Sequence, residues 1–221
     1  MTEDELLEAL RLRASEPASR VDEHSTVLDL EEPGDLSRLL NLSHQLQENL
    51  DRLAVDGPES VDPAVIAMAE GLVEDMNSPA ARELPGPADA TTLDAAEAEL
   101  GLRLPALLRA IYLEIANGGI GPGTGLLGVT GGWTPHGSTL VEEYHHSVEG
   151  PWDDWKWPSK LLPVADLGDG VSACVDTSRA GCPVLEWDAG DLDWDAEGPQ
   201  APDLVEVAPT LAAWLGAWLE S

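Results

Sequence analysis

The chain has 221 residues, of which 42 are acidic and 11 are basic, so its formal net charge near neutral pH is −31. This charge excludes ordinary nucleic-acid binding and argues against an anionic membrane surface as partner, because both need Lys and Arg in number. Hydrophobic residues make up 43% of the chain and charged residues 24%, which is typical of a globular protein rather than a disordered one.

Residues 1–87 are expected to form an acidic helical region. Thr2 and Glu5 have the spacing of a capping box, and the leucines that follow share one face of a helix. Two further amphipathic helices are expected, one at 35–53 and one that starts at the Asp62-Pro63 pair. A segment rich in Pro and Gly at 83–90 then predicts a linker.

Residues 88–221 are expected to form a domain of the α+β class. A short helix capped by Thr91 or Thr92 should end at Gly101, and a second helix should run from Pro105 to the stop at Asn117-Gly118-Gly119. Short apolar runs bounded by turn residues predict strands, and a closing stretch with one apolar face predicts a helix. The strands are expected at 126–129, 161–164, 171–175 and 183–187, and the last helix at 211–219. Helices packed on a sheet follow from this order.

The order of these signals resembles that of the SUKH superfamily. The opening signature is Glu97, Glu99-Leu100-Gly101, Leu104-Pro105, Tyr112 and Asn117-Gly118-Gly119. Later segments continue it: Leu162–Ala165, Asp169-Gly170, Val175-Asp176, Pro183-Val184 and Ala208–Leu219. The resemblance covers residues 88–221, and it implies a SUKH-like sheet with packed helices, preceded here by a small all-helical extension.

The resemblance also implies a non-enzymatic binding domain without catalytic residues or cofactors. Members of the superfamily include fungal regulators of cell-wall assembly and bacterial immunity proteins, which block toxins by direct binding. Such toxins are often nucleases or deaminases, and many are basic. Because a strongly acidic surface attracts a basic partner, we expect an immunity protein that occludes the substrate groove of a basic toxin domain. The alternative is a regulatory or scaffold protein of cell-wall or envelope assembly.

Two segments in which Trp alternates with acidic residues are the candidate partner-binding site. Indole anchors among polar groups are typical of interface hot spots, and complementary charge accelerates association. The candidates are Trp152, Asp153, Asp154, Trp155 and Trp157 in the first segment, and Glu186, Asp188, Asp191, Asp193, Trp194 and Asp195 in the second. Solvated loops, edge packing and stacking on a sugar ring remain alternatives. The second segment also imitates a calcium loop, but Ala196 and Pro202 stand where such a loop needs its glycine and its bidentate acid.

Other chemistry has weaker support, and no metal is expected. Gly121-x-Gly123-x-Gly125 follows a helix and precedes a strand, the reverse of the order in a phosphate-binding loop. The cluster from Glu142 to His146 has Glu-x-x-His spacing but no matching ligands on a second helix, so it supports only an alternative hydrolase hypothesis. Cys174 is expected as a core thiol, and with Cys182 it forms no metal-binding motif.

The charge of the first residues and the length of the apolar runs indicate the cellular location. The first five residues carry three acids, which is the wrong charge for a secretory signal, and no apolar run approaches the length of a membrane-spanning helix. We therefore expect a cytoplasmic protein, in which two reduced thiols are favoured over a disulfide.

Overall fold

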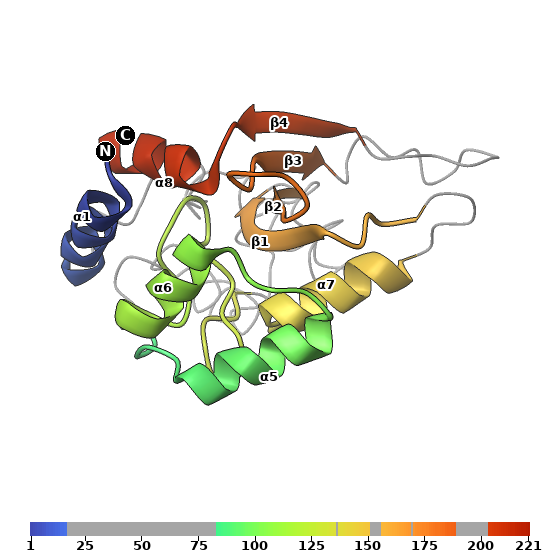
Figure 1. Ribbon diagram of the computed structural model, residues 1–221, viewed down its shortest axis with the longest axis horizontal. Helices are drawn as coiled ribbons and strands as arrows, with labels where there is room; N and C mark the ends of the chain where they lie inside the picture. Colours follow the sequence, from blue (N-terminus) through green and yellow to red (C-terminus); the bar gives the residue numbers. More distant parts are fainter. Residues whose placement is uncertain (17–82, 136, 151–155, 169, 189–202) are drawn as a thin grey trace, which may run out of the picture. The chain divides into compact units, whose positions relative to one another are not determined.

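The computed structural model describes residues 1–16, 83–135, 137–150, 156–168, 170–188 and 203–221 (Figure 1). All of them belong to one compact unit, which comprises Met1–Ser25 and Ala80–Ser221. The helices expected at 35–53 and after Asp62 lie outside the described residues.

The described part of the chain has five helices and one antiparallel sheet, so the α+β prediction is confirmed. The helices are α1 (Glu3–Ser15), α5 (Ala90–Leu100), α6 (Ala106–Glu114), α7 (Leu140–Glu149) and α8 (Leu211–Glu220). The strands are β1 (Leu161–Gly168), β2 (Val171–Asp176), β3 (Val184–Asp188) and β4 (Leu204–Ala208), and they pair in the order β1-β2-β3-β4. Figure 1 shows α5 and α7 on the β1 side of the sheet, whereas α8 follows β4 at the other side. None of the described helices has the length and apolar character needed to cross a bilayer.

Two elements were not predicted from the sequence, and one predicted strand was wrong. Helix α7 and strand β4 were both missed. The run at 126–129 is not a strand of the sheet, because it makes only an isolated bridge from Leu126 to Ala165 on β1. This segment lies along the outer side of β1, where the Leu127 N–H donates to the Val164 carbonyl at 2.8 Å.

The helices begin where side chains satisfy backbone N–H groups that have no partner within the helix. The capping box predicted for α1 is confirmed, since the Thr2 hydroxyl accepts from the Glu5 N–H while Glu5 accepts from the Thr2 N–H. Helix α7 has the same box, made by Thr139 and Glu142. The cap predicted for α5 was wrong: Asp89, not Thr91 or Thr92, accepts from the Thr92 N–H at 2.7 Å.

The stabilising effect of the Glu142 carboxylate is expected to disappear in acid. The N–H of Thr139, and next its hydroxyl, donate to this carboxylate and hold its pKa below the ordinary value of 4.5. A lowered folded pKa means that the contribution is complete above the ordinary value and is lost as pH falls through the folded one. The melting temperature should therefore differ between the protein and Glu142→Gln at about pH 7, and the difference should shrink towards about pH 3. A difference that is unchanged by pH would contradict the assignment.

Helix α1 packs onto the C-terminal part of the chain, against α8. Leu6, Leu7 and Leu10 are buried. The Arg13 guanidinium donates to the Trp218 carbonyl at 2.6 Å and lies 4.0 Å from the centroid of a Trp218 ring. The division of the chain between residues 87 and 88 stays a prediction. Helix α1, which precedes that division, shares the hydrophobic core of the part that follows it.

Candidate functional site

The structure describes three of the eleven predicted partner-binding residues. The other eight lie outside the described residues: Trp152, Asp153, Asp154, Trp155, Asp191, Asp193, Trp194 and Asp195. The three that remain are Trp157, which precedes β1, and Glu186 and Asp188 on β3. They fall into two different environments.

Trp157 belongs to the core, which corrects its assignment to a docking surface. Its side chain is 4% exposed, and its indole N–H donates to the Leu161 carbonyl at 2.8 Å. Its ring also meets the ring of Trp187 edge to face, with centroids 5.6 Å apart. A tryptophan in this position anchors the start of β1 to the sheet and has no free face to offer a partner.

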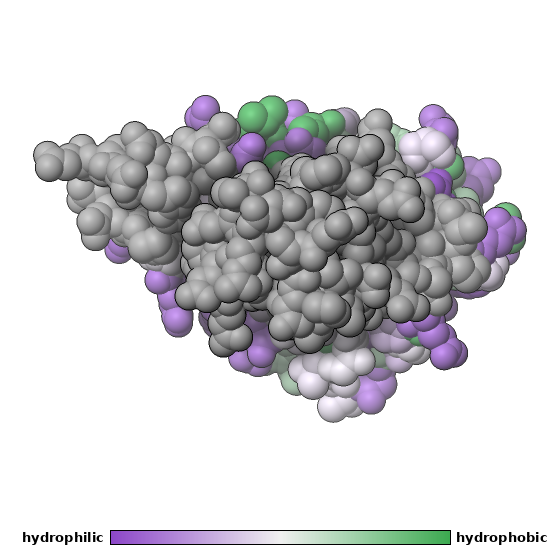
Figure 2. All heavy atoms as spheres, turned by 180° about the vertical axis from the view of Figure 1, so that it is seen from behind, coloured by the Kyte–Doolittle hydropathy of each residue, from purple (hydrophilic) through white to green (hydrophobic). Residues whose placement is uncertain are grey.

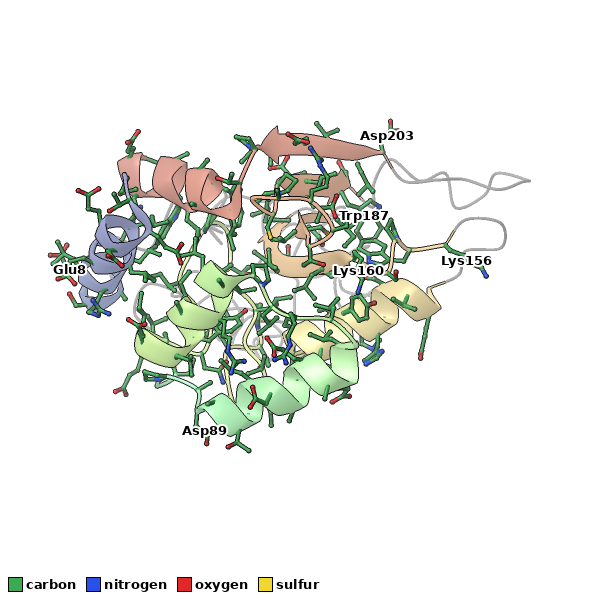
Figure 3. All side chains as sticks on the ribbon, in the orientation of Figure 1. Glu8, Asp89, Lys156, Lys160, Trp187 and Asp203 are labelled. Carbon is green, nitrogen blue, oxygen red and sulfur yellow. The ribbon has the colours of Figure 1, made fainter. Side chains whose placement is uncertain are left out.

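Glu186 and Asp188 are half-buried on β3, and they precede and follow Trp187 in the sequence. Trp187 is labelled in Figure 3. Glu186 pairs with Ala173 on one side and with Val205 of β4 on the other. Glu186 is therefore a neighbour of β4, and both acids stay predicted partner-binding residues.

Strand β4 is the exposed surface that sequence reasoning missed. Val205 is 58% exposed and Val207 41%, and Glu206 between them is also exposed. Figure 2, seen from behind, shows apolar residues at the upper rim, where β4 runs in Figure 1. The signal was present in the sequence, because Leu204–Ala208 is rich in β-branched residues and follows a segment full of turn residues.

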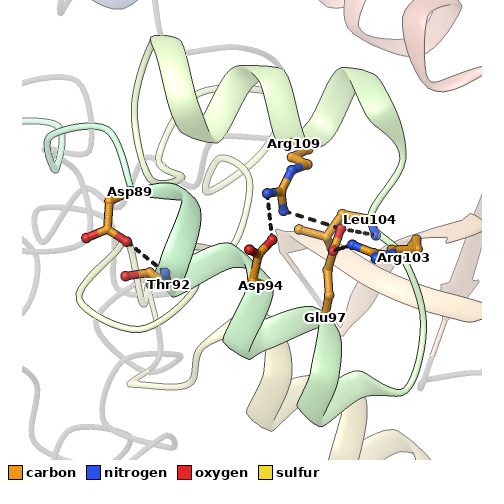
Figure 4. A network of polar contacts seen from close by, with 7 residues as sticks. All are labelled: Asp89, Thr92, Asp94, Glu97, Arg103, Leu104 and Arg109. Atoms are coloured by element: carbon orange, nitrogen blue, oxygen red, sulfur yellow. Dashed lines mark hydrogen bonds and ion pairs between the residues drawn. The ribbon is translucent and has the colours of Figure 1, made fainter.

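A buried carboxylate joins α5 to α6 (Figure 4). The side chain of Glu97 is 5% exposed, and its oxygens accept from the Leu104 N–H at 3.0 Å and from the Arg103 guanidinium at 2.6 Å. Arg109 bridges the network, with one nitrogen 3.5 Å from Glu97 and another 2.8 Å from Asp94. Two guanidinium groups balance two carboxylates, although the Arg109 nitrogen that faces Glu97 makes no hydrogen bond. The network fixes the corner between the two helices.

An open hollow lies beside this network. Its volume is ≈ 600 Å³, and it is lined by Asp94, Glu97, Ala98, Gly101, Leu102, Arg103 and Lys160. Most of its charged groups already pair within the network, so the hollow offers a ligand few polar groups that are not engaged.

The Asn117-Gly118-Gly119 segment is also structural. Asn117 is 3% exposed; its side chain accepts from the Val129 N–H at 2.9 Å, and its carbonyl accepts from the Trp133 N–H at 2.8 Å. Gly118 and Gly119 have φ values of 85° and 83°, which favour glycine. This segment ties the loop after α6 to the turn that precedes α7.

The remaining candidates for chemistry show no activated group. Burial raises the pKa of the Cys174 thiol far above its ordinary value, and burial followed by Asp176 raises that of Cys182, so neither thiol is poised to form a thiolate. Glu142 caps its own helix. The ring nitrogens of His145 and His146 lie 3.9 Å from carboxylate oxygens of Glu99 and Glu143. Among the described residues no group of three or more His, Cys, Asp or Glu side chains could hold a metal ion.

Comparison with known proteins agrees with the order of elements. The family described as SMI1 / KNR4 family (SUKH-1) matches residues 87–217, more than half of the chain. A search of curated proteins finds no significant relative. The residues that carried the resemblance have defined structural roles, since Glu97 closes the α5–α6 corner and Asn117 closes the loop after α6. The chain therefore belongs to the SMI1 / KNR4 family (SUKH-1).

Proposed function

We propose that this protein is a non-enzymatic binding module, an immunity protein that blocks a basic toxin domain of the nuclease or deaminase type. It does so by covering the groove in which the toxin binds its substrate. The single observation that carries the proposal is a net charge of −31 on a chain of this family.

The charge supplies both attraction and selectivity. A nuclease or nucleic-acid deaminase needs a groove lined with Lys and Arg, because its substrate is a polyanion. An acidic protein has the same sign of charge as that substrate. The groove therefore attracts it, and the association rate constant rises. The same charge repels acidic proteins and offers neutral ones no attraction, which favours basic partners.

The described polar groups support binding rather than catalysis. The two side chains whose pKa departs furthest from its ordinary value, Tyr112 and Cys174, are buried in the core, and desolvation is the cause of both shifts. Glu97 and Glu142 are engaged in a helix corner and a helix cap. An immunity protein meets its toxin in the cytoplasm, which is where the proposal places this chain.

The alternative is a regulator or scaffold of cell-wall or envelope assembly. It predicts several endogenous partners and an altered cell shape on deletion, in a strain that encodes no toxin. The immunity proposal predicts that deletion is harmful only when the toxin is present. Competition between wild-type and deletion strains, with and without the toxin gene, separates the two.

Affinity for a basic toxin domain is expected to fall steeply with salt. A panel of basic nuclease and deaminase domains is titrated with the purified chain. The Kd should rise about tenfold or more between about 50 mM and about 500 mM NaCl, because screening weakens charge attraction. An acidic domain of similar size is the control. Salt-insensitive binding would remove the electrostatic mechanism, and substrate turnover by this chain would remove the proposal.

A further inference from the structure

The sheet has two ends, and they differ. The outer side of β1 is covered by the chain itself, since Leu127 donates to Val164 at 2.8 Å and Thr124 donates to Asp166 at 2.9 Å. Strand β4 is the other end, and no strand of the described residues lies beyond it (Figure 1). An open strand end presents N–H and C=O groups to any extended chain that approaches.

The register shows which peptide groups of β4 point outwards. The Asp176 N–H donates to the Pro183 carbonyl at 3.0 Å, so this pair is a hydrogen-bonded one in the β2–β3 ladder. Such pairs alternate along antiparallel strands, so Leu185 and Trp187 bond towards β2, and Glu186 bonds towards β4.

Val205 is the partner of Glu186, so its peptide groups face β3. The residues on either side of it, Leu204 and Glu206, therefore turn their N–H and C=O groups to the open side of β4. Their positions along the strand, two residues apart, match the repeat at which an added antiparallel strand forms its bonds.

The side chains leave this edge accessible. Val205, Glu206 and Val207 are all exposed, whereas Leu204 is half-buried and Ala208 is buried. Neither Pro nor Lys, which commonly protect an edge strand, occurs between Asp203 and Ala208. The register shifts between Glu206 and Ala208, so the regular part of the edge is Leu204 to Glu206. The charged residues along it are acidic: Asp203 lies immediately before the strand (Figure 3), and Glu206 lies in its middle.

We propose that β4 is a docking edge, to which a basic partner adds an extended segment as a further antiparallel strand. Main-chain bonds to Leu204 and Glu206 supply affinity, and Lys or Arg side chains opposite Asp203 and Glu206 supply selectivity. The proposal rests on the proposed function, because a basic toxin is the partner it describes. It names the strand through which that partner is held.

Charge decides between this occupant and a second copy of the chain. Two β4 edges that paired with each other would bring two acidic strands together, and like charges on adjacent strands are destabilising. A strand with Lys or Arg at alternate positions would instead place positive charges opposite Asp203 and Glu206. Glu206 already pairs with Arg179 at 2.7 Å, but both side chains are about half exposed, so this pair is weak enough to be shared or exchanged.

Two variants at one position separate the main-chain bond from the charge. Glu206→Pro removes an N–H that faces outwards, so it leaves the β3–β4 ladder intact while blocking the edge. Glu206→Gln removes the charge and keeps the N–H. The probe is a synthetic peptide of about ten residues in which Lys alternates with Val or Thr, and the control peptide has the same charges but carries Pro at its centre.

The full chain is expected to bind the alternating peptide about tenfold more tightly than the peptide interrupted by Pro. Glu206→Pro should weaken binding about tenfold, and Glu206→Gln about two- to fivefold. Equal binding of the two peptides, or unchanged binding to Glu206→Pro, would overturn the proposal. So would self-association of the chain that Glu206→Pro abolishes, because the occupant would then be a second copy.

Amide hydrogen exchange tests the same edge without a substitution. Binding of the alternating peptide should slow exchange at the Leu204 and Glu206 amides and leave the Val205 amide, which already bonds to β3, unchanged. Slower exchange only at other amides would overturn the proposal.

Toxin inhibition distinguishes the docking edge from the proposed function. Equal inhibition by the protein and by Glu206→Pro refutes only the docking edge. Peptide binding at β4 without inhibition of any toxin refutes only the immunity function.

Discussion

Replacing Glu97 with Ala is expected to lower the free energy of unfolding by about 3 kcal/mol or more. The substitution leaves the buried Leu104 N–H without an acceptor and takes the buried counter-charge from Arg109, whose side chain is 25% exposed. Removal of one partner from such a pair leaves the other charge buried and unpaired. The free-energy cost of that unpaired charge exceeds the net stabilisation by the intact pair. Arg103 adds little, because its side chain is 85% exposed.

The matched controls lie in the same network. Glu97→Gln keeps an acceptor for Leu104 and should lose about half as much. Asp94→Asn breaks a pair whose carboxylate is 63% exposed, and should lose less than about 1 kcal/mol. Urea unfolding of the three variants measures the order. If Glu97→Ala were no more destabilised than Asp94→Asn, the buried corner between α5 and α6 would not be a major source of stability.

Gly128→Ala is expected to be strongly destabilising, with a loss of about 4 kcal/mol or failure to fold. The new methyl group would meet backbone atoms of Trp133 and Asn117, which cannot move aside as a flexible side chain can. Gly128 also donates to the Trp133 carbonyl at 2.7 Å and accepts from the Leu140 N–H at 2.8 Å. The collision would therefore disturb both the loop after α6 and the start of α7.

Gly86→Ala is the control, because nothing lies within 4 Å of the added methyl group, and its effect should stay within about 0.5 kcal/mol. Gly131→Ala tests backbone strain alone. Its surroundings are open but its φ is 76°, so it should cost about 1 kcal/mol. Thermal unfolding ranks the three variants. Near-normal stability of Gly128→Ala would show that this loop rearranges more easily than its contacts indicate.

Both predictions concern residues that hold the fold together rather than the proposed docking edge. Glu97 and Asn117, which carried the resemblance to the family, are engaged in the architecture of the domain and leave no group for a ligand. The proposed docking edge is β4, which lies within the matched range 87–217, but Val205 and Glu206 are not among the residues that carried the resemblance. A substitution at β4 should therefore affect binding with little change in stability, whereas one at Glu97 should do the reverse.

Local signals explain how much was predictable. The sequence by itself determined the α+β class, the family, and the start of α1 at the Thr2–Glu5 box, because caps, glycine stops and apolar periodicity depend on residues only a few positions apart. The predicted N-cap of α5 was two or three residues too late. Asp89, Thr91 and Thr92 can all cap a helix, and packing selects among them.

The tertiary structure alone decided which of these residues face solvent. Trp157 is buried because Leu161 supplies a carbonyl for its indole and Trp187 covers its ring. Val205 is exposed because the sheet ends at β4, whereas an equally apolar strand at the centre would be covered. The physical reason is that burial depends on which distant segments come to lie alongside a residue, and a local pattern of apolar and polar residues carries no record of those neighbours.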